Sequence, residues 1–337
     1  MSTEKYTPLV SVLIVNWNAQ KYLPQCLTHL YRQNYPNFET LLVDNASTDG
    51  SPDWVAEHFP QVRLICSDKN LGFAEGNNLA ASYARGEWLA LLNPDAFVAP
   101  DWLTTLIEAT QLFPQYDFFS SQLLQALSPE KLDGMGDILH VSGLAWRCNY
   151  NLNPANLSAH WQQPREVFGA CAAAALYRAS DFHELGGFYV PFFSYHEDVD
   201  LSFRLRLRGK RCLHVPQSVA LHIGSGTTKR NSPFQIYHGH RNLVWSYVQN
   251  MPTPLLWKYL PIHLLSQLVL MALYTVRGPR KAIWQAKWDA IRGLKTAWQV
   301  RKAVQATATA SAAEIERVMA RGWLEPFLGS RFRRDKG

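Results

Sequence analysis

The sequence is poor in cysteine and lacks the cysteine patterns that build disulfide frameworks or zinc sites. Its five cysteines are scattered over 337 residues, and none belongs to a Cys-x-x-Cys pair. An odd, scattered set of this kind is typical of a protein in a reducing compartment. The first residues also lack an apolar core followed by a small-residue cleavage site. We therefore expect no secretory signal and a cytoplasmic location.

Glycine-rich phosphate-binding motifs are missing as well. No G-x-G-x-x-G follows the first apolar run, and no G-x-x-x-x-G-K-S/T occurs anywhere. These absences disfavour a Rossmann dinucleotide site and a P-loop. The chain is nevertheless 47% hydrophobic and 12% aromatic, which is enough to bury a sizeable core. Its length predicts one large domain or a domain with an appendage.

Acidic residues are scarce at the C-terminal end. From residue 277 onward there are 14 Lys and Arg against 5 Asp and Glu, a balance of +9 in a chain whose net charge is +6. A basic tail can bind nucleic acid, but the preceding stretch 259–276 has no charged residue, and aromatic residues flank and follow it. This composition is typical of a segment at a lipid headgroup layer. We predict attachment to the inner face of the membrane and no nucleic-acid partner.

The apolar stretch is slightly shorter than the roughly 20 residues of a spanning helix. His263, Ser266 and Gln267 also interrupt it, which favours a segment that lies on the bilayer. The alternative is a helical hairpin packed on the main domain with a solvated basic face.

Apolar runs of strand length alternate with segments of helical periodicity. Strands are expected at residues 10–16, 38–44, 62–66 and 88–93, and helices at 22–33, 53–59, 74–84 and 102–113. The alternation predicts an α/β fold whose mostly parallel sheet is covered by helices on both faces. We place this domain at residues 1–250 and a basic helical region at 251–337.

Asn or Asp follows each of the four predicted strands. Any one such residue is explained by a turn, but four in succession indicate a site, because ligands bind beyond the carboxyl ends of parallel strands. The residues are Asn16 and Asn18, Asp44 and Asn45, Asp68 and Asn70, and Asn93 and Asp95.

Five segments of the chain together resemble family 2 glycosyltransferases, which have the Rossmann-like GT-A fold. They are residues 10–18, 41–51, 70–78, 91–103 and 195–211, in the family's order and spacing. Within the family the chain is most similar to bacterial rhamnosyltransferases of lipopolysaccharide or O-antigen synthesis. The resemblance implies transfer of a sugar from a nucleoside-diphosphate donor, dTDP-rhamnose in this subset, to a hydroxyl of a lipid-linked saccharide acceptor.

The resemblance also implies a divalent cation, Mg²⁺ or Mn²⁺. Negative charge grows on the departing diphosphate, and a cation held by one or two carboxylates and by phosphate oxygens neutralises it. Asn93-Pro94-Asp95 stands at the family's Asp-x-Asp metal motif, so Asp95 is the expected metal ligand, and Asn93 replaces the first acid and is assigned to the donor. His222 follows a predicted strand at 220–223 and completes the metal set, unless it is a structural histidine.

The acceptor hydroxyl needs a general base. Glu197-Asp198, before a predicted helix at 199–207, matches the family's Glu-Asp element, with Asp198 at the base position and Glu197 beside it. One base and no nucleophilic carboxylate predict inversion at the anomeric carbon. The alternative is that the helix dipole alone favours acids at this position, by up to about 1 kcal/mol.

The remaining donor contacts are assigned by position. Asp44 matches the family's nucleotide-binding aspartate, and Arg241 is placed to neutralise diphosphate. Lys229 and Arg230 have the same role, for the diphosphate either of the donor or of a lipid-linked acceptor. Residues 224–226 are expected to close over the donor phosphates. The full donor-binding set is Asn16, Asn18, Asp44, Asn45, Gly72, Asn77, Asn78, Asn93 and Arg241.

Two other functions stay open. A sugar-nucleotidyltransferase shares the α/β layout, but usually needs a glycine-rich basic loop where this chain has Asn16-Trp17-Asn18. The other is a non-catalytic, membrane-attached module that binds sugar nucleotides, which would have no need of both Asp95 and Asp198. The chain has no Gln-x-x-Arg-Trp motif, so we expect a single-addition enzyme and not a processive synthase.

Overall fold

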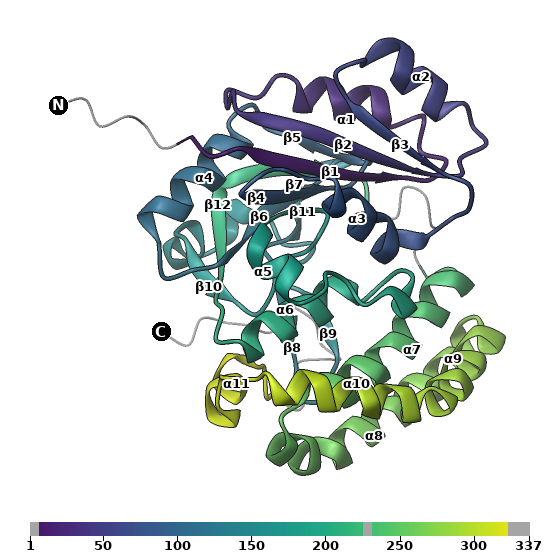
Figure 1. The fold of residues 1–337 in the computed structure, drawn as a ribbon. Coiled ribbons are helices and arrows are strands. Elements are labelled where there is room, and N and C mark those ends of the chain that lie inside the picture. The colour runs from purple at the N-terminus through teal and green to yellow at the C-terminus, as the bar shows by residue number, and fades with distance from the viewer. Residues whose placement is uncertain (1–6, 225–230, 323–337) are drawn as a thin grey trace.

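The computed structural model describes residues 7–224 and 231–322. A twisted sheet with helices on its faces forms the upper part in Figure 1, and a layer of C-terminal helices lies below it. The expected α/β architecture with a helical C-terminal part is therefore confirmed.

The N-terminal half of the sheet is parallel. Its strands are β1 (Val10–Asn16), β2 (Phe38–Asn45), β3 (Arg63–Ser67) and β4 (Trp88–Leu92). They lie in the order β3-β2-β1-β4, and the register places Asn16 beside Asp44. The carboxyl ends of these strands therefore meet at one edge, as the sequence predicts.

Alternate residues of β1 enter two different cores. Val12 and Ile14 pack with residues of α1 (Leu23–Leu30) and α4 (Trp102–Leu112), whereas Leu13 packs with residues of α3 (Gly72–Ser82). A strand buried on both faces needs a continuous apolar run, which is why residues 10–16 show no alternation. Helix α2 (Ser51–His58) lies beside β3.

The second half of the sheet contains antiparallel strands. It adds β5 (Ala96–Val98), β6 (Phe118–Gln125), β7 (Ser128–Gly134), β10 (Arg165–Val167), β11 (Ala174–Arg178) and β12 (Cys212–His222). The order continues β4-β11-β6-β12-β10, with β11 antiparallel to both of its neighbours. β8 (Asp137–Leu139) and β9 (Ala145–Arg147) form a separate hairpin. Of these strands the sequence predicts only the end of β12, because their patterns are short and mixed.

Helix α6 (Glu197–Leu207) follows α5 (Ala179–Glu184) and begins two residues earlier than predicted, so Glu197 and Asp198 lie in its first turn. Three single-turn 3₁₀ helices cover 154–156, 159–162 and 190–192. Helix α1 ends at Leu30, three residues before the predicted end, and the chain continues there in tighter turns.

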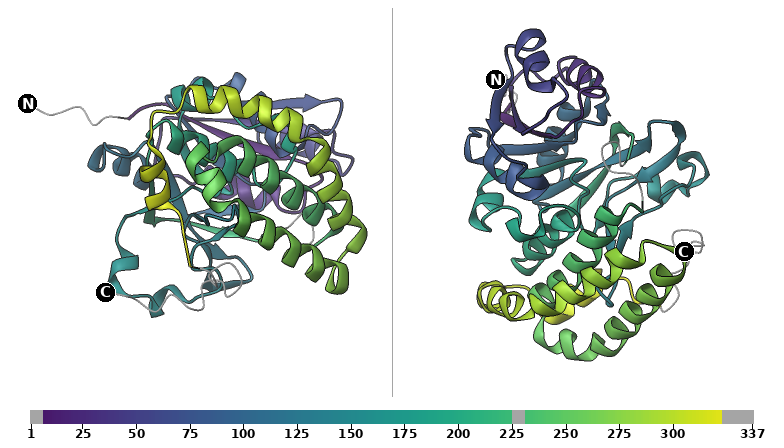
Figure 2. Two further views of the ribbon diagram at one scale, coloured as in Figure 1. Left: turned by 90° about the horizontal axis from the view of Figure 1, so that it is seen from below. Right: turned by 90° about the vertical axis from the view of Figure 1, so that its right-hand side faces the viewer.

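The C-terminal helices pack beside and below α6. They are α7 (Pro233–Asn250), α8 (Thr253–Arg277), α9 (Arg280–Arg292), α10 (Leu294–Ala306) and α11 (Ala312–Val318). α7 contacts α6, α9 and α10, and Figure 2 shows these helices as one layer. Phe203, Tyr247 and Leu255 share a core that joins this layer to the sheet-containing part.

Helix α8 turns its polar side toward the protein and its apolar side outward. His263, Ser266 and Gln267 are buried, and His263 hydrogen-bonds through Nδ1 to the carbonyl of Ser142 at 2.7 Å. Six leucines and valines between Leu264 and Val276 point outward and are 40 to 82% exposed. Within residues 7–224 and 231–322, α8 is the one helix long and apolar enough to cross a membrane by length and composition, and 17% of that stretch is buried.

Candidate active site

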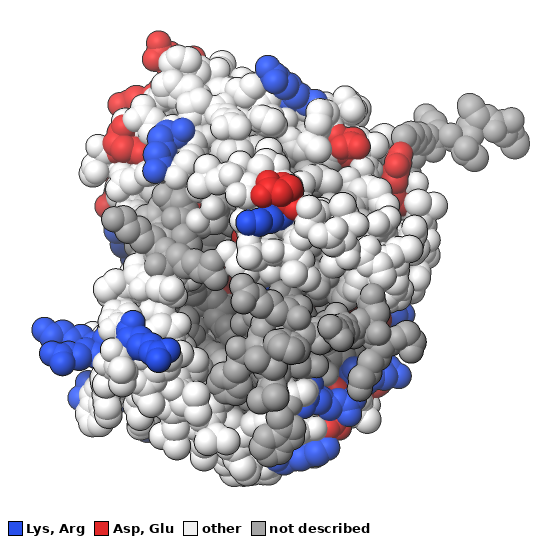
Figure 3. Space-filling model, turned by 180° about the vertical axis from the view of Figure 1, so that it is seen from behind, with Lys and Arg blue, Asp and Glu red and all other residues white. Residues whose placement is uncertain are grey.

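A cleft of about 1160 Å³ lies at the carboxyl edge of the parallel strands. Its walls come from the ends of β1, β2 and β4, from the β7–β9 segment and from the start of α6. Seen from behind, the molecule is hollowed between its sheet-containing half and its helical half (Figure 3). Three groups of polar residues that lie far apart in the sequence therefore share one cavity: Asn93 and Asp95, Glu197 and Asp198, and His222.

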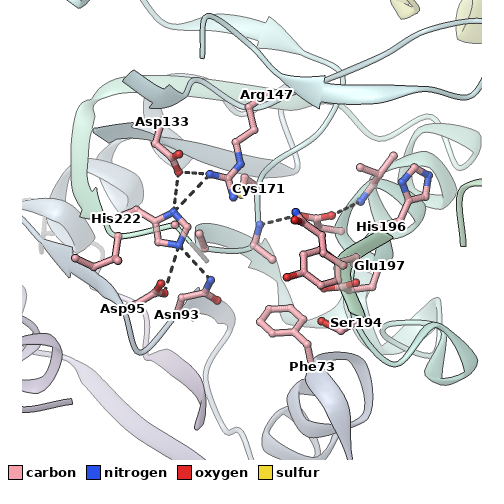
Figure 4. A pocket seen from close by; sticks show the side chains of 18 of the residues that line it. Phe73, Asn93, Asp95, Asp133, Arg147, Cys171, Ser194, His196, Glu197 and His222 are labelled. Atoms are coloured by element: carbon pink, nitrogen blue, oxygen red, sulfur yellow. Dashed lines mark hydrogen bonds and ion pairs between the residues drawn. The ribbon is translucent and has the colours of Figure 1, made fainter. Parts of the chain in front are cut away.

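Asp95 and His222 lie side by side because of a strand pairing. The turn Asn93-Pro94-Asp95 joins β4 to β5, and β5 pairs with β12 so that His222 stands opposite Ala96. His222 Nε2 is 3.3 Å from Asp95 Oδ1 and 3.5 Å from Asn93 Nδ2. The structure therefore brings the predicted metal ligands together (Figure 4).

These two ligands fit a divalent cation whose other ligands are phosphate and water. Two adjacent ligands of an octahedral Mg²⁺ at about 2.1 Å lie about 3 Å apart, close to the spacing of Asp95 Oδ1 and His222 Nε2. The buried Asn93 Oδ1 has no hydrogen-bond partner within the described part of the chain. No group of three His, Cys, Asp or Glu side chains suited to a metal occurs among residues 7–224 and 231–322, so Asp95 and His222 would share the cation with the substrate.

His222 has a second carboxylate neighbour that sequence reasoning missed. Its Nδ1 is 2.7 Å from Asp133 Oδ2, and Arg147 forms an ion pair with the same carboxylate. Burial favours neutral Asp133, but Arg147 and His222 outweigh it and hold the pKa of Asp133 below its usual value. Burial likewise favours neutral His222, but hydrogen bonds to Asp133 and Asp95 raise its pKa.

The Glu-Asp pair lies at the start of α6. His196, in a left-handed conformation with φ of 74°, turns the chain into the helix. Asp198 accepts hydrogen bonds from the backbone N–H groups of Ala172 at 3.3 Å and Val199 at 2.8 Å. Figure 4 shows Glu197 on the side of the cleft away from His222. The expected base and the expected metal ligands thus face one cavity.

Burial determines the proton affinity of this pair. It raises the pKa of Asp198, although the two backbone N–H groups and Arg147 work in the opposite direction. It raises the pKa of Glu197 well above its usual value, and the charge of Asp198 adds to the effect. The backbone hydrogen bonds to Asp198 limit the rise of its pKa, which is smaller than that of Glu197. A raised pKa makes ionised Asp198 a stronger base.

Asp137 is a further acidic residue in the cleft. It is 5% exposed, and its Oδ2 has no hydrogen-bond partner in the described ranges. Burial and then the charge of Asp198 raise its pKa well above the usual value. Asp133, Asp137 and Arg147 carry no spacing signal in the sequence, and only their three-dimensional position places them here.

Three of the predicted donor-binding residues line the cleft: Asn45, Gly72 and Asn93. Asn45 donates through Nδ2 to the carbonyl of Gly72 at 2.9 Å, and its Oδ1 has no partner among the residues described. This amide therefore joins the end of β2 to the start of α3.

Other predicted donor contacts are engaged with the protein itself and do not line the cleft. Asn16 donates to Asp44 at 2.6 Å, and Asp44 also accepts from the backbone of Ser47 at 2.9 Å. Asn18 accepts from the N–H of Thr48 at 2.8 Å. These bonds hold the loop after β2 against the end of β1.

Asn77, Asn78 and Arg241 are likewise engaged. Asn77 donates to the carbonyl of Phe73 at 2.9 Å, and Asn78 both donates to and accepts from the backbone of Phe188 at 2.8 Å. Arg241 donates to the carbonyls of residues 191 and 192. Their donor-binding roles remain predictions. Residues 225, 226, 229 and 230 of the expected phosphate loop lie outside the described residues.

These features define an α/β protein with a polar cleft at the carboxyl edge of its parallel strands. A family model described as Glycosyl transferase family 2 matches residues 11–186, so the chain belongs to glycosyl transferase family 2.

Two bacterial proteins of the family show which of its members the chain resembles. The chain is 27% identical over 270 residues to the N-acetylglucosaminyl-diphospho-decaprenol L-rhamnosyltransferase of Mycobacterium tuberculosis, covering 70% of this chain and 83% of that protein. It is 29% identical over 234 residues to the O-antigen biosynthesis protein RfbC of Myxococcus xanthus, covering 67% of this chain and 18% of the much longer relative. The expected similarity to bacterial rhamnosyltransferases of surface polysaccharide synthesis is confirmed.

Solved structures confirm the GT-A fold. The mannosyltransferase PcManGT of Pyrobaculum calidifontis, solved with GDP-Man and Mn²⁺, superposes with a TM-score of 0.55 at 20% identity, covering 90% of this chain and 86% of that one. TarS of S. aureus, solved with UDP, gives a TM-score of 0.55 at 15% identity over 97% of this chain and 93% of that one.

Proposed function

We propose that the protein is an inverting, metal-dependent rhamnosyltransferase that uses dTDP-rhamnose and a lipid-linked saccharide acceptor in surface polysaccharide synthesis. The observation that supports this function is the single cleft in which Asp95 and His222 face Asp198. The name of the mycobacterial relative supports the choice of sugar and of a diphospholipid acceptor.

In this proposal one set of cleft residues binds the cation and the donor, and another activates the acceptor. Asp95 and His222 would hold Mg²⁺ or Mn²⁺, which stabilises the charge of the departing diphosphate. Asn45, Gly72 and Asn93 would contact the donor, since they line the same cleft. Asp198 would accept the proton of the acceptor hydroxyl, while Glu197 stays protonated beside it. Residues 1–250 would form the catalytic part and residues 251–337 the membrane-facing part.

A panel of nucleotide sugars tests the function directly. The full chain would be incubated with Mn²⁺ and each donor, with and without membrane extract, and the released nucleoside diphosphate measured. We expect dTDP release from dTDP-rhamnose, increased by the extract and abolished by EDTA. Release from another donor and not from dTDP-rhamnose would contradict the choice of sugar.

The stereochemical course is a further expected result. A single base without a nucleophilic carboxylate gives one displacement, so a β-linked dTDP-rhamnose should yield an α-rhamnoside. The anomeric one-bond carbon–proton coupling constant of the product measures this outcome. A β-rhamnoside would rule out the single-displacement assignment of Asp198.

Membrane attachment is proposed for the surface formed by α8, α9 and α10. Helix α8 presents leucine and valine outward, and four tryptophans on this surface are 42 to 60% exposed: Trp257, Trp284, Trp288 and Trp298. Lys and Arg side chains project from the helical half in Figure 3. An outward apolar face with interfacial tryptophans and cations fits a helix lying in an anionic leaflet, because polar α8 residues are already used inside the protein.

Liposome co-sedimentation tests this attachment. The full chain should bind anionic vesicles at low salt, and binding should weaken at high salt, because each Lys or Arg near the surface contributes about 1 kcal/mol that salt screens. A double variant, Leu268→Asp with Val276→Asp, changes two outward positions and should release the protein, whereas Leu112→Asp on the exposed end of α4 should bind like the wild type. Equal binding by all three chains would contradict the proposal.

A further inference from the structure

We propose that Asp133 is a positioning residue that orients the imidazole of His222 for a divalent cation, and that Arg147 holds Asp133 in place. The inference rests on the proposed metal site at Asp95 and His222. It concerns two residues, Asp133 and Arg147, that lie outside the five sequence segments on which the family resemblance rests.

The hydrogen-bond geometry decides which nitrogen of His222 faces the cation. Asp133 Oδ2 lies 2.7 Å from Nδ1, whereas Nε2 points to Asp95 and Asn93. Arg147 forms an ion pair with Asp133, so this carboxylate is charged and can only accept hydrogen bonds. The 2.7 Å contact to Asp133 is shorter than the 3.5 Å contact between Nδ1 and the Arg147 guanidinium, so Nδ1 is the donor to Asp133. Nε2 is then the nitrogen on the Asp95 side that a cation would bind in place of a proton.

The sheet fixes the positions of both partners. Asp133 lies on β7 and His222 on β12, and both strands pair with β6, one on each side. His222 is opposite Gln125, and Asp133 lies between the residues opposite Leu124 and Leu123. The two side chains therefore meet across the end of β6 without help from a loop.

This arrangement resembles a general feature of metal sites. A ligating histidine nearly always donates its other N–H to a carboxylate, which fixes the ring and raises its basicity, and loss of the carboxylate typically costs 10–100-fold in metal affinity. The buried pair meets this description, because His222 is 3% and Asp133 5% exposed. Arg147 additionally balances the charge of Asp133 in a cleft that already contains Asp95, Asp137 and Asp198.

Mn²⁺ binding to the full chain in the presence of dTDP tests the proposal without relying on turnover. Electron paramagnetic resonance of free Mn²⁺ gives the affinity, and the ¹⁴N coupling of bound Mn²⁺ reports an imidazole ligand. We expect Asp133→Leu to bind Mn²⁺ about 10–100-fold more weakly and to lose intensity in the ¹⁴N signal. Asp133→Asn, which keeps an acceptor oxygen without the charge, should lie between this variant and the wild type.

Asp137→Asn is the matched control, since it removes a buried cleft carboxylate whose Oδ2 forms no hydrogen bond within the described residues. Its loss of affinity should be smaller than that of either Asp133 variant. His222→Ala should remove the ¹⁴N signal entirely. If a folded Asp133 variant binds Mn²⁺ as tightly as the wild type with an unchanged ¹⁴N signal, the positioning role is wrong. If the wild type binds no Mn²⁺ with dTDP, the metal site fails, and the positioning role with it.

Discussion

Asp198→Asn should lower turnover at least about a hundredfold while equilibrium binding of dTDP with Mn²⁺ stays near the wild-type value. The variant keeps the shape of the side chain, and its Oδ1 can still accept the N–H of Val199. It loses the ability to take the proton of the acceptor hydroxyl, together with the 3.3 Å hydrogen bond from the N–H of Ala172, because an amide nitrogen replaces the accepting oxygen. Nucleoside diphosphate release under saturating donor and acceptor measures turnover, and calorimetry measures dTDP binding.

Glu197→Gln is the comparison for this variant. Burial and the neighbouring Asp198 charge raise the pKa of Glu197 well above its usual value, which favours its neutral form, and a neutral amide imitates a neutral carboxyl group. We therefore expect a much smaller loss of turnover than in Asp198→Asn. If Glu197→Gln were inactive and Asp198→Asn turned over like the wild type, the base would be Glu197 and the assignment would have to be reversed.

Gly72→Ala should destabilise the protein by about 2 to 4 kcal/mol, from the left-handed backbone and the overpacking together. Gly72 has a φ of +74°, and an added Cβ would lie 2.4 Å from the carbonyl oxygen of Phe193. That carbonyl accepts hydrogen bonds from the N–H groups of Phe73 at 2.7 Å and Ala74 at 3.1 Å. The methyl group would therefore separate α3 from the loop that leads to the Glu-Asp pair.

Urea denaturation measures this effect, and Gly239→Ala provides the control. Gly239 lies inside α7, and no atom lies within 4 Å of its added Cβ. Alanine is favoured over glycine in a helix by up to about 1 kcal/mol, so Gly239→Ala should be neutral or stabilising. Equal stability of the two variants would show that the contact between Gly72 and Phe193 does not support the fold.

Gly72 also shows that the role of a residue cannot be assigned from its type and motif alone. The sequence places it in a family-like segment and assigns it to the donor. The structure places it on the cleft wall, but glycine is required there because the backbone of Phe193 lies too close for a Cβ atom. Asn78 shows the same limit, since both atoms of its amide are bonded to Phe188. An amide in a motif can serve a ligand or a neighbouring backbone, and local sequence does not distinguish these partners.

The strands β1 to β4 and the helices between them were predicted from the sequence alone, and the resemblance to family 2 glycosyltransferases singled out Asp95 and Asp198. Local periodicity suffices there, because β1, β2 and β4 are largely buried apolar runs and a helix follows each of β1, β2 and β3. β3 is a partly exposed edge strand. Only the tertiary structure decided that His222 stands beside Asp95, that Asp133 and Arg147 join it, and that α8 turns its leucines outward. These contacts depend on which distant strands pair and on which side of a helix finds polar partners, and neither is encoded in the spacing of neighbouring residues.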